Sequence, residues 1–590
     1  MSAHKFVVVD EIMEQMEAAK SGIVPGSVTQ AVVSGIQNVP SNIVQHSIGG
    51  AAAASYTTFP LSPIVKNCCL DKTYLNLEFD VKFDMKFESL TANKHTLIPF
   101  YLGLRDNSSI FNQIQILIEN SAIWTTTYQR EESVLSYNSL PETEIRGNNQ
   151  YASIEKMREG KYCPMKRYVV DFTPNNATET IPIIQHFKMT IDINRLTPLL
   201  SNIHFTTPHM GNLRLKVFMQ EFEKCLFICP DYNYFAFTIP SGTDTAAKIS
   251  EVLNQPFLNQ YWQFYPFYKF TEGIANTSIP FFAYNVDDKA IVIPSKVTIS
   301  NPSNGDFMSF ANGIAEIVQT CFDIKDEEYQ RLSDYFASLG SVIIPSQVWS
   351  TNVFNNSQIV GKAQATYPAT QIGNIGGYNL DFVSVWTHPT QHPCTFTNEF
   401  LKNIQLILDG RPINPIPYQY VSDKCVVDTT QAIIDTDHEE INHDYISSLT
   451  TFNETDTSEY IDKKLADYYG NGQKNNRSLA RNYISNPNTF ALNFSTNLPD
   501  AFHSGACILE NSNRQAVLRY IAQSAVDDNE NFKDAQGNYV NNKFPMIINH
   551  KSDDLVSGFS AFCDCCIVLT YDPARGTCFD GQLSWAAPYV

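Results

Sequence analysis

A strict alternation of apolar and polar side chains runs from residue 75 to residue 88. Every second residue from Leu75 onward is Leu, Phe, Val or Met, and the residues between them are Asn, Asp, Glu or Lys. Because successive side chains of a β-strand point to opposite faces of its sheet, this stretch predicts one long strand with a single buried face. We therefore expect an extended sheet that is apolar on one side.

The same period of two recurs in shorter stretches, at residues 114–118, 189–193, 213–217, 291–299, 378–386, 404–408, 516–521 and 563–571. Clusters of Pro, Asn, Gly and Asp separate these stretches, as turns between strands require. Helical patterns are few, and the clearest cover residues 326–339 and 458–469. The sequence therefore predicts a mainly β fold of the antiparallel sandwich class with a few short helices. Two long polar stretches, 128–165 and 410–485, are expected to be loop insertions on that scaffold.

The first 55 residues differ from the rest of the chain. Four apolar residues fall at helical spacing, with acidic residues around the other side: Phe6, Val9, Met13 and Met16. This pattern predicts one short amphipathic helix, which we expect to pack against a protein neighbour. Glycine, proline and alanine are frequent in residues 22–54, so residues 1–55 are expected to form an extended arm with little core of its own.

A weak internal repeat links the two halves of the chain. Three pairs of segments match in the same order, at separations of 290, 303 and about 301 residues: 111–123 with 401–413, 75–79 with 378–382, and 191–196 with 492–498. The shared order and the nearly constant separation predict a duplicated β domain. The alternative is two unrelated β domains that draw on the same strand-forming residues.

The repeat suggests a first β domain over residues 56–240 and a second over residues 241–590. About 100 residues, 240–345, separate the repeated segments. Whether these residues connect the two domains or form a large loop within the second one stays open from the sequence.

Charge and composition exclude some functions. The net charge of −20 argues against broad, nonspecific binding of nucleic acid. The sequence contains no run of about 18 apolar residues, the length that a membrane-spanning helix needs. Only 17% of the residues are charged while 43% are hydrophobic, which favours a largely neutral surface that meets other subunits. The start of the chain is unlike a secretory signal, so the 13 cysteines are expected to be reduced thiols.

Two segments combine residues that bind metals in other proteins. His438 and His443 are five residues apart in an acidic stretch, whereas a metalloprotease helix needs a separation of four to place both imidazoles on one face. A solvated loop is the prediction there, and a divalent-ion site is the alternative. Cys563 and Cys565 alternate with the period of a strand, so they are expected to be core residues rather than zinc ligands, although Cys578 lies nearby.

No catalytic constellation emerges from the remaining motifs. His204 and His209 flank a turn between strands and are predicted to be loop histidines. Residues 557–561 lack the second glycine of a nucleophile elbow, and the glycine-rich segment 372–378 precedes a strand, whereas a phosphate-binding loop precedes a helix. We therefore expect no enzyme activity, no catalytic, cofactor-binding or metal-binding residues, and no cofactor.

Three segments carry a resemblance to a known family: 98–106, with the sequence Ile-Pro-Phe-Tyr-Leu-Gly-Leu-Arg-Asp, the strand 111–123, and the stretch from 195–199 to 213–217. With the duplicated layout and the arm, the chain resembles the double jelly-roll major capsid proteins of tailless icosahedral DNA viruses. Within that family it is most similar to those of virophages and Polinton-like viruses. The resemblance covers roughly residues 56–590 by layout and is specific at only these short segments.

The resemblance implies two tandem eight-stranded jelly rolls and a homotrimer of pseudo-hexagonal outline. It further implies loops that project as towers, an arm along the inner face of the shell, and a place in the virion after synthesis in the host cytoplasm. Neighbouring capsomers, minor capsid proteins at the pentons, and an inner membrane or cement proteins are the implied partners. Two other classes stay open: a carbohydrate-active or deglycosylating enzyme built on two β-sandwiches, and a viral spike or fibre that binds a receptor.

Overall fold

The computed structural model describes part of the chain, namely residues 15, 18, 22–34, 36–37, 56–62, 67–104, 107–119, 121–126, 166–196, 199, 205–230, 265–271, 274–275, 281, 283–292, 294–302, 308–309, 315–355, 370–374, 379–392, 401–408, 411–412, 418–419, 490–493, 506–507, 517–524, 532–533, 539–540 and 555–584. The predicted insertions at 128–165 and 410–485, the predicted helix at 458–469 and most of the predicted N-terminal helix lie outside these ranges, apart from the short strand segments at 411–412 and 418–419 and the helical residues Gln15 and Ala18.

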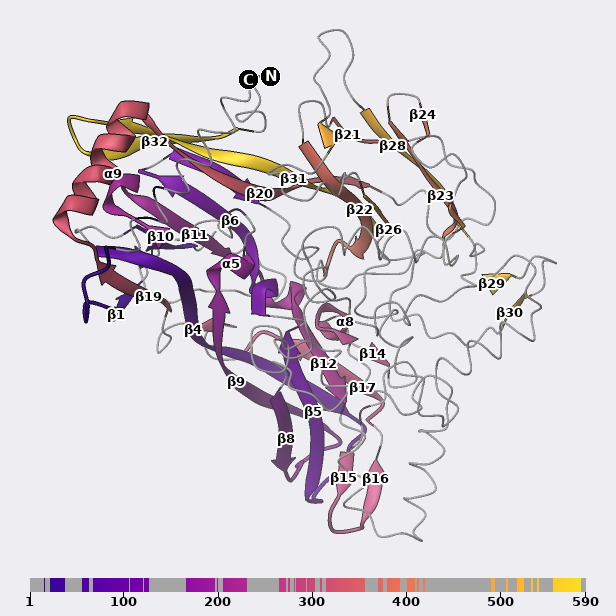
Figure 1. Cartoon of the computed structure of the whole chain (residues 1–590). Helices are drawn as coiled ribbons and strands as arrows, with labels where there is room; N and C mark the ends of the chain where they lie inside the picture. The colour runs from indigo at the N-terminus through magenta and orange to yellow at the C-terminus, as the bar shows by residue number, and fades with distance from the viewer. Residues whose placement is uncertain are drawn as a thin grey trace.

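Three sheets form what we call the first unit (Figure 1). Sheet 1 contains β1 (Thr29–Ser34), β4 (Asn67–Glu88), β9 (Thr178–Asp192), β10 (Phe205–Thr206), β14 (Ile274–Ala275), β17 (Lys296–Ser300), β18 (Met308–Ser309) and β19 (Ala315–Asp323). Sheet 2 contains β2 (Ile36–Gln37), β3 (Tyr56–Pro60), β6 (Phe111–Ile118), β7 (Ser121–Thr126) and β11 (Leu213–Met219). Sheet 3 contains β5 (Thr96–Leu104), β8 (Lys166–Phe172), β12 (Leu226–Pro230), β13 (Tyr265–Pro266), β15 (Ala283–Asn285) and β16 (Ala290–Val292).

Two further sheets form what we call the second unit. Sheet 4 contains β20 (Ser341–Asn355), β22 (Asn379–Pro389), β26 (Phe490–Asn493), β27 (Ala506–Cys507), β31 (Leu555–Asp572) and β32 (Thr577–Ser584). Sheet 5 contains β21 (Thr370–Asn374), β23 (Leu401–Leu408), β24 (Arg411–Pro412), β25 (Tyr418–Gln419) and β28 (Val517–Ser524), and a separate pair joins β29 (Phe532–Lys533) to β30 (Tyr539–Val540).

Helices are short and few among the described residues. They are η1 (Asn107–Ile110), α5 (Ile193–Leu196), η4 (Pro208–Met210), η5 (Phe222–Lys224), α8 (Tyr268–Thr271) and α9 (Asp326–Leu339). None of the helices in the described ranges is long and apolar enough to cross a membrane. The sequence-based prediction of a mainly β fold is confirmed, and α9 begins and ends where the helical pattern of residues 326–339 predicts.

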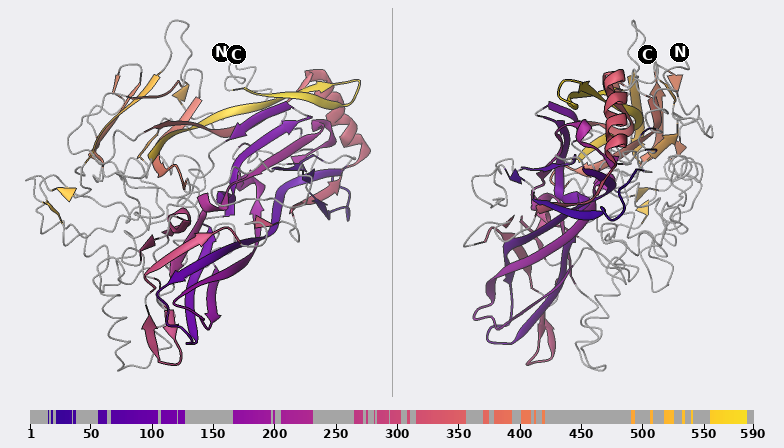
Figure 2. Two further views of the ribbon diagram at one scale, coloured as in Figure 1. Left: turned by 180° about the vertical axis from the view of Figure 1, so that it is seen from behind. Right: turned by 60° about the vertical axis from the view of Figure 1, so that its left-hand side comes forward.

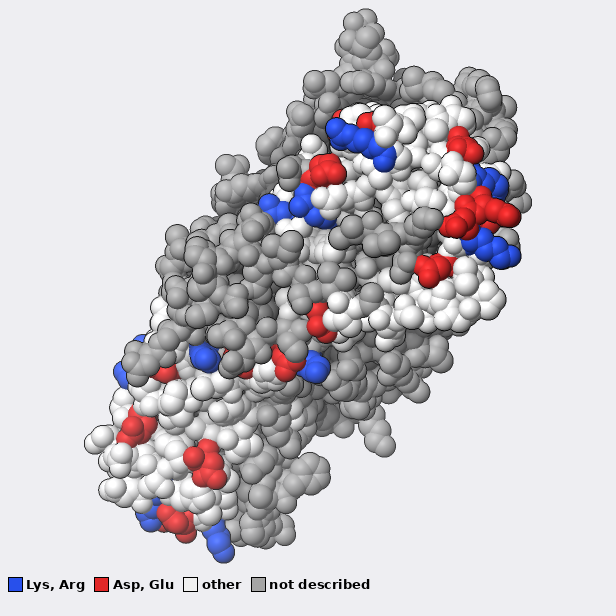
Figure 3. Space-filling view, turned by 90° about the vertical axis from the view of Figure 1, so that its left-hand side faces the viewer, with Lys and Arg blue, Asp and Glu red and all other residues white. Residues whose placement is uncertain are grey.

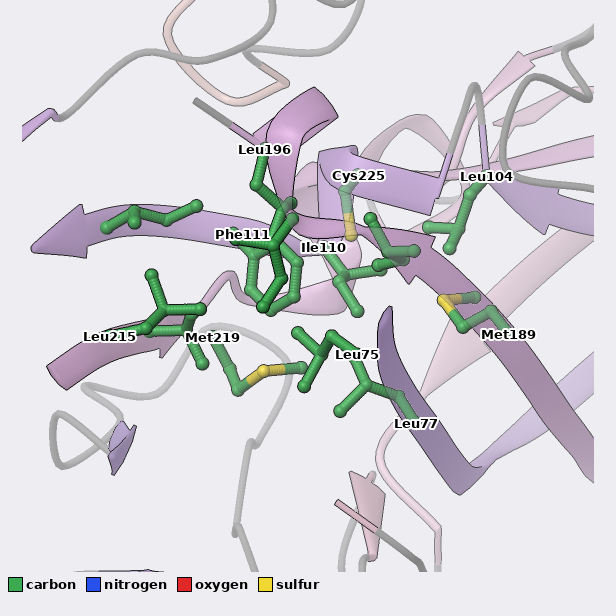
Figure 4. Packing of buried hydrophobic residues seen from close by; sticks show 14 of the residues in the cluster. Leu75, Leu77, Leu104, Ile110, Phe111, Met189, Leu196, Leu215, Met219 and Cys225 are labelled. Carbon is green, nitrogen blue, oxygen red and sulfur yellow. The ribbon is translucent and has the colours of Figure 1, made fainter. Parts of the chain in front are cut away.

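The predicted strand at 75–88 lies within β4, which begins earlier, at Asn67. On its inner face Leu75, Phe79 and Phe87 are at most 1% exposed, as the alternation requires. Phe79 stacks on Phe187 of β9 with ring centroids 5.4 Å apart. Figure 4 shows Leu75 gathered with residues of β6, β9 and β11, so sheets 1 and 2 close on one apolar core.

Sheets 2 and 5 are built in the same way. In sheet 2, β11 lies between β3 and β6, with β7 on the outside; in sheet 5, β28 lies between β21 and β23, with β24 on the outside. The registers agree as well, because Leu117 pairs with Ala122 in one hairpin and Ile407 pairs with Pro412 in the other. Ile407 lies 290 positions after Leu117, and Pro412 lies 290 positions after Ala122. This is the separation found between the first pair of repeated segments in the sequence.

Sheets 1 and 4 repeat the same correspondence. β4 pairs with β9, β10 and β19, while β22 pairs with β26, β27 and β31. Phe79 pairs with Phe187, and its counterpart Phe382 pairs with Asn493, which is 306 residues after Phe187. The sequence match of residues 191–196 with 492–498, at a separation of about 301, therefore pairs β9 with the correct strand, β26. The strand register gives a separation of 306, so the sequence match is displaced by five residues along that strand. Sheet 3 has no counterpart among the described strands.

The strands between residues 274 and 323 add to the sheets of the first unit. β17 and β19 pair with β4, and β15 pairs with β5. The sequence left the place of residues 240–345 open. We propose that the first domain continues to the end of β19 and that the second begins with β20, in place of a boundary at residue 240.

The described part of the N-terminal arm lies along the end of β19. β1 pairs with β19 over six residues, and Ile23 forms a bridge with Ile324. The amide of Val24 donates to the carbonyl of Asp323 at 2.8 Å. Over β1 and β2 the described part of the arm is extended, and these hydrogen bonds attach it to its own chain.

Candidate functional site

The sequence motifs considered for catalysis do not come together. Residues 435–443 and His204 lie outside the described residues. Ser557 and Ser560 lie within the long strand β31, whereas a nucleophile elbow requires a turn between a strand and a helix. In the described ranges no group of three or more His, Cys, Asp or Glu side chains is arranged to hold a metal ion.

Two cysteines of β31 are reduced and buried, as predicted. Cys563 and Cys565 are fully buried. Cys566 is fully buried too, although strand alternation places it on the opposite face. β31 is an interior strand: β20 pairs along one side, and β22 followed by β32 pairs along the other. Both faces of the sheet are covered at this point, which the alternation alone did not indicate.

Charged side chains form a ladder on the outer face of β4 and β9. The two ring nitrogens of His186 lie 2.8 Å from Asp80 Oδ1 and 2.9 Å from Glu78 Oε1. Lys188 Nζ lies 3.7 Å from Glu78 Oε2. These pairs match the strand register, in which His186 faces Asp80 and Lys188 faces Glu78. Exposed cross-strand pairs of this kind favour one register but contribute little to stability.

A second polar cluster joins the β4–β5 turn to the β15–β16 turn. Lys94 Nζ lies 2.7 Å from Asp288 Oδ1, and His95 Nε2 lies 2.6 Å from Asp171 Oδ1. The hydrogen bond to Asp288 raises the pKa of Lys94 above its ordinary value of 10.5. Asn285 accepts hydrogen bonds from the amides of Asp287 and Asp288, which is the pattern of a side chain that shapes its own turn. The geometry explains how the turns are held and leaves no open coordination position.

The junction between the two units carries the closest contacts between distant parts of the chain. The β31–β32 hairpin lies beside α9 at one end of the first unit, seen from both sides in Figures 1 and 2. Tyr571 of β31 bonds to α9 through its hydroxyl, 3.0 Å from Ser333 Oγ, and its amide donates to the carbonyl of Gly340 at 3.0 Å. β32 contacts β6, β7 and η4 of the first unit.

Two glycines let the hairpin approach this closely. A methyl group on Gly211 would lie 2.1 Å from the carbonyl oxygen of Cys578. A methyl group on Gly581 would lie 3.3 Å from both Ile118 and Ile123, which belong to β6 and β7. β32 thus closes the core of the first unit.

His209 lies at the centre of this junction. It was predicted to be a loop histidine, and it does lie in the short helix η4 between two strands, but its side chain is only 1% exposed. Its ring centroid is 4.3 Å from that of Tyr329 and 5.7 Å from that of Phe336, both on α9. Burial lowers the pKa of His209 from 6.5 to about 4. Its neighbours come from residues far along the chain, so no local pattern could have indicated this setting.

A second buried histidine ties the loop after β22 to the first unit. His392 Nε2 donates to the carbonyl of Leu226 at 2.9 Å, and its ring meets that of Phe227 edge to face at 4.7 Å. Together with the hairpin and α9, this contact holds the second unit against sheets 2 and 3. The two units are therefore packed together and are not joined by a linker alone.

The described surface is mostly uncharged. On the face shown in Figure 3, charged side chains occur in small groups of mixed sign, separated by wide uncharged areas. Among the described residues, four large apolar side chains are exposed: Val28, Val32, Ile184 and Phe579. Val32 belongs to β1, whose partner in sheet 1 is β19. This surface suits contact with other protein surfaces better than contact with a polyanion.

No family model and no curated protein matches the chain. Among solved structures it is similar to the major capsid protein of mavirus, with 11% identity, a TM-score of 0.43, and coverage of 96% of this chain and 92% of that one. It is also similar to the Sputnik virophage structure, with 10% identity, a TM-score of 0.42, and coverage of 95% and 89%. The Faustovirus major capsid protein matches with 9% identity, a TM-score of 0.40, and coverage of 97% and 100%.

These proteins belong to the class of viral capsid proteins that the sequence resembles. All three matches have identities of 11% or less and TM-scores of 0.43 or less. The function of this chain is therefore inferred from its own strand pairing.

Proposed function

We propose that this chain is the major capsid protein of an icosahedral DNA virus, folded as a double jelly roll. The observation that carries the proposal is the duplication: sheets 1 and 2 correspond to sheets 4 and 5 in strand order and in hairpin register. Three copies of a chain with two equivalent units present six similar units around a threefold axis. A doubled unit thus supplies a near-sixfold building block for a closed shell.

The character of the described surface supports a structural role. A chain with 17% charged residues and an exposed apolar edge is suited to burying surface between copies. The proposal includes a homotrimeric capsomer, contacts with neighbouring capsomers and minor capsid proteins, a place in the virion after synthesis in the host cytoplasm, and no enzymatic activity. No observation on the described residues specifically favours a carbohydrate-active enzyme or a receptor-binding spike.

Light scattering and negative-stain microscopy of the purified chain test the proposal. We expect a particle of about three times the chain mass of 66.5 kDa, or a larger assembly built from it, with a hexagonal outline. The interface should be of obligate size, above about 2,000 Å² in total, so the trimer should persist on dilution in physiological salt. A monomer that persists at high protein concentration would contradict the proposal.

A further inference from the structure

His209 is enclosed by side chains from two elements that lie on the far side of the junction. Tyr329 and Phe336 come from α9, and Tyr571 of β31 lies at 6.4 Å between ring centroids. His209 itself follows β10 and precedes β11, which belong to sheets 1 and 2. The imidazole is thus attached to the first unit through η4 and is enclosed by aromatic side chains of α9 and of the β31–β32 hairpin.

Neither ring nitrogen of His209 has a hydrogen-bond partner in the structure. The hydroxyl of Thr207, just before η4, is likewise buried without a partner. Buried polar groups are normally hydrogen-bonded, so two such groups within three residues of the chain mark a contact that is held by packing alone. A protonated imidazole in this position would add a buried charge with no counter-charge, which is far more costly than the neutral ring.

The titratable groups that face His209 are neutral phenols and a thiol, so none of them forms an ion pair with a protonated imidazole. From α9 it meets the phenol of Tyr329, and from β31 the phenol of Tyr571, whose hydroxyl is engaged by Ser333. Cys578 of β32, whose backbone lies against Gly211, is a buried thiol whose pKa burial raises to about 12.

Two ion pairs engage charged residues on the same elements. On α9, Arg331 Nη2 lies 2.7 Å from Glu328 Oε2. At the end of β31, Asp572 Oδ2 lies 3.3 Å from Arg575 Nε. Burial alone accounts for the lowered pKa of His209, with no contribution from a charged neighbour.

We propose that this junction is an acid-sensitive latch: protonation of His209 separates η4 from α9 and the β31–β32 hairpin. In the closed form the ring stays neutral, whereas in an opened form it is hydrated and titrates near the ordinary value of 6.5. The closed form is therefore fully favoured above pH 6.5 and loses its advantage as the pH falls toward 4. With the buried pKa at about 4, the population of the opened form should rise about 20-fold between pH 7 and pH 5.

The latch goes beyond the proposed capsid role and does not depend on it. Opening would lift β32 from β6 and β7 and expose Cys578, which is 1% exposed when the junction is closed. In a shell, it would make each subunit looser in acid without unfolding it. Cys578 therefore provides a local reporter, and Cys563, in the part of β31 that pairs with β22, reports global unfolding.

The test measures the labelling rate of each thiol in the full-length protein with a dithiodipyridine reagent, by mass spectrometry, from pH 7 to pH 5. Comparing variants at the same pH cancels the reagent's own pH dependence. Relative to His209→Phe at the same pH, we expect the rate at Cys578 in the wild type to rise about 20-fold from pH 7 to pH 5, with no matching rise at Cys563. His209→Phe places a ring that does not titrate among the same aromatic side chains, so it should abolish the rise. The matched control His186→Phe, on the exposed face of β9, should retain the rise.

An equal rise at Cys578 in the wild type and in His209→Phe would overturn the proposal, as would parallel labelling of Cys563. A second measurement covers the case in which His209→Phe does not fold. Hydrogen exchange of the wild type, corrected for intrinsic rates, should show loss of protection at pH 5 in residues 333–340 and 571–582. Unchanged protection there would also overturn the proposal.

Discussion

Gly211 ends η4 with φ 68° and ψ −152°, a backbone conformation that is open essentially to glycine alone. Its carbonyl accepts a hydrogen bond from the hydroxyl of Ser62, and its α-carbon faces the backbone of Cys578. Gly340 has a similar φ of 69° at the end of α9, but a methyl group there would meet nothing within 4 Å. Gly211 thus combines a backbone conformation restricted to glycine with close packing, whereas Gly340 has only the milder strain of the left-handed helical region.

Gly211→Ala should destabilise the protein by at least about 3 kcal/mol, because it adds a clash with backbone atoms to an unfavourable φ. Gly340→Ala, the matched control, should cost about 1 kcal/mol, because only the φ is unfavourable. Chemical denaturation of both variants measures the difference. Equal losses would mean that β32 shifts freely and that the hairpin is not closely packed on η4.

At the level of elements, β1 extends sheet 1 at the edge of β19. The six paired residues of β1 carry no charge and alternate little, so the sequence identified them as part of an arm and did not indicate a strand. The strand of residues 75–88 and the helix of residues 326–339 were predictable because their periods are local. The places of β17 and β19 were not, because their partners in β4 lie more than 200 residues away.

Deleting residues 1–37 removes β1 and β2 and should lower the melting temperature by several degrees, because it uncovers one edge of β19 and of β3. The first unit should still fold, because the buried core residues that the structure describes begin at Phe59. Deleting residues 1–14 leaves both strands in place and serves as the control. If the two deletions melt alike, the pairing of β1 with β19 contributes nothing to stability.

At the level of the whole molecule, the two units share structure through β31. One half of this strand pairs with β22 of the second unit, and the other half pairs with β32, which covers β6 and β7 of the first unit. The duplication was predictable from the 290-residue repeat, but the sharing was not, since the sequence repeat says nothing about how its copies pack. Likewise, His209 is buried by residues 329, 336 and 571, none of them near it in sequence.

We therefore expect the full chain to unfold in one cooperative calorimetric transition. Truncation after Asp572 removes β32 and exposes Ile118 and Ile123, so the first unit should melt separately and at lower temperature. Truncation after Ser584 removes only the last six residues and is the matched control. A single unchanged transition after the longer truncation would show that β32 is dispensable for the first unit.

A ribosome makes β32, which begins at Thr577, more than 450 residues after Ile118 and Ile123, the residues that it covers. Until β32 emerges, an apolar patch on the first unit stays open, and nascent chains with such patches are targets for chaperones and proteases. A prematurely terminated chain would keep that patch exposed for its whole lifetime. The long sequence separation between β32 and the strands that it covers thus makes translation through β32 a condition for a finished surface, and a chain that stops earlier is marked for removal by its own structure.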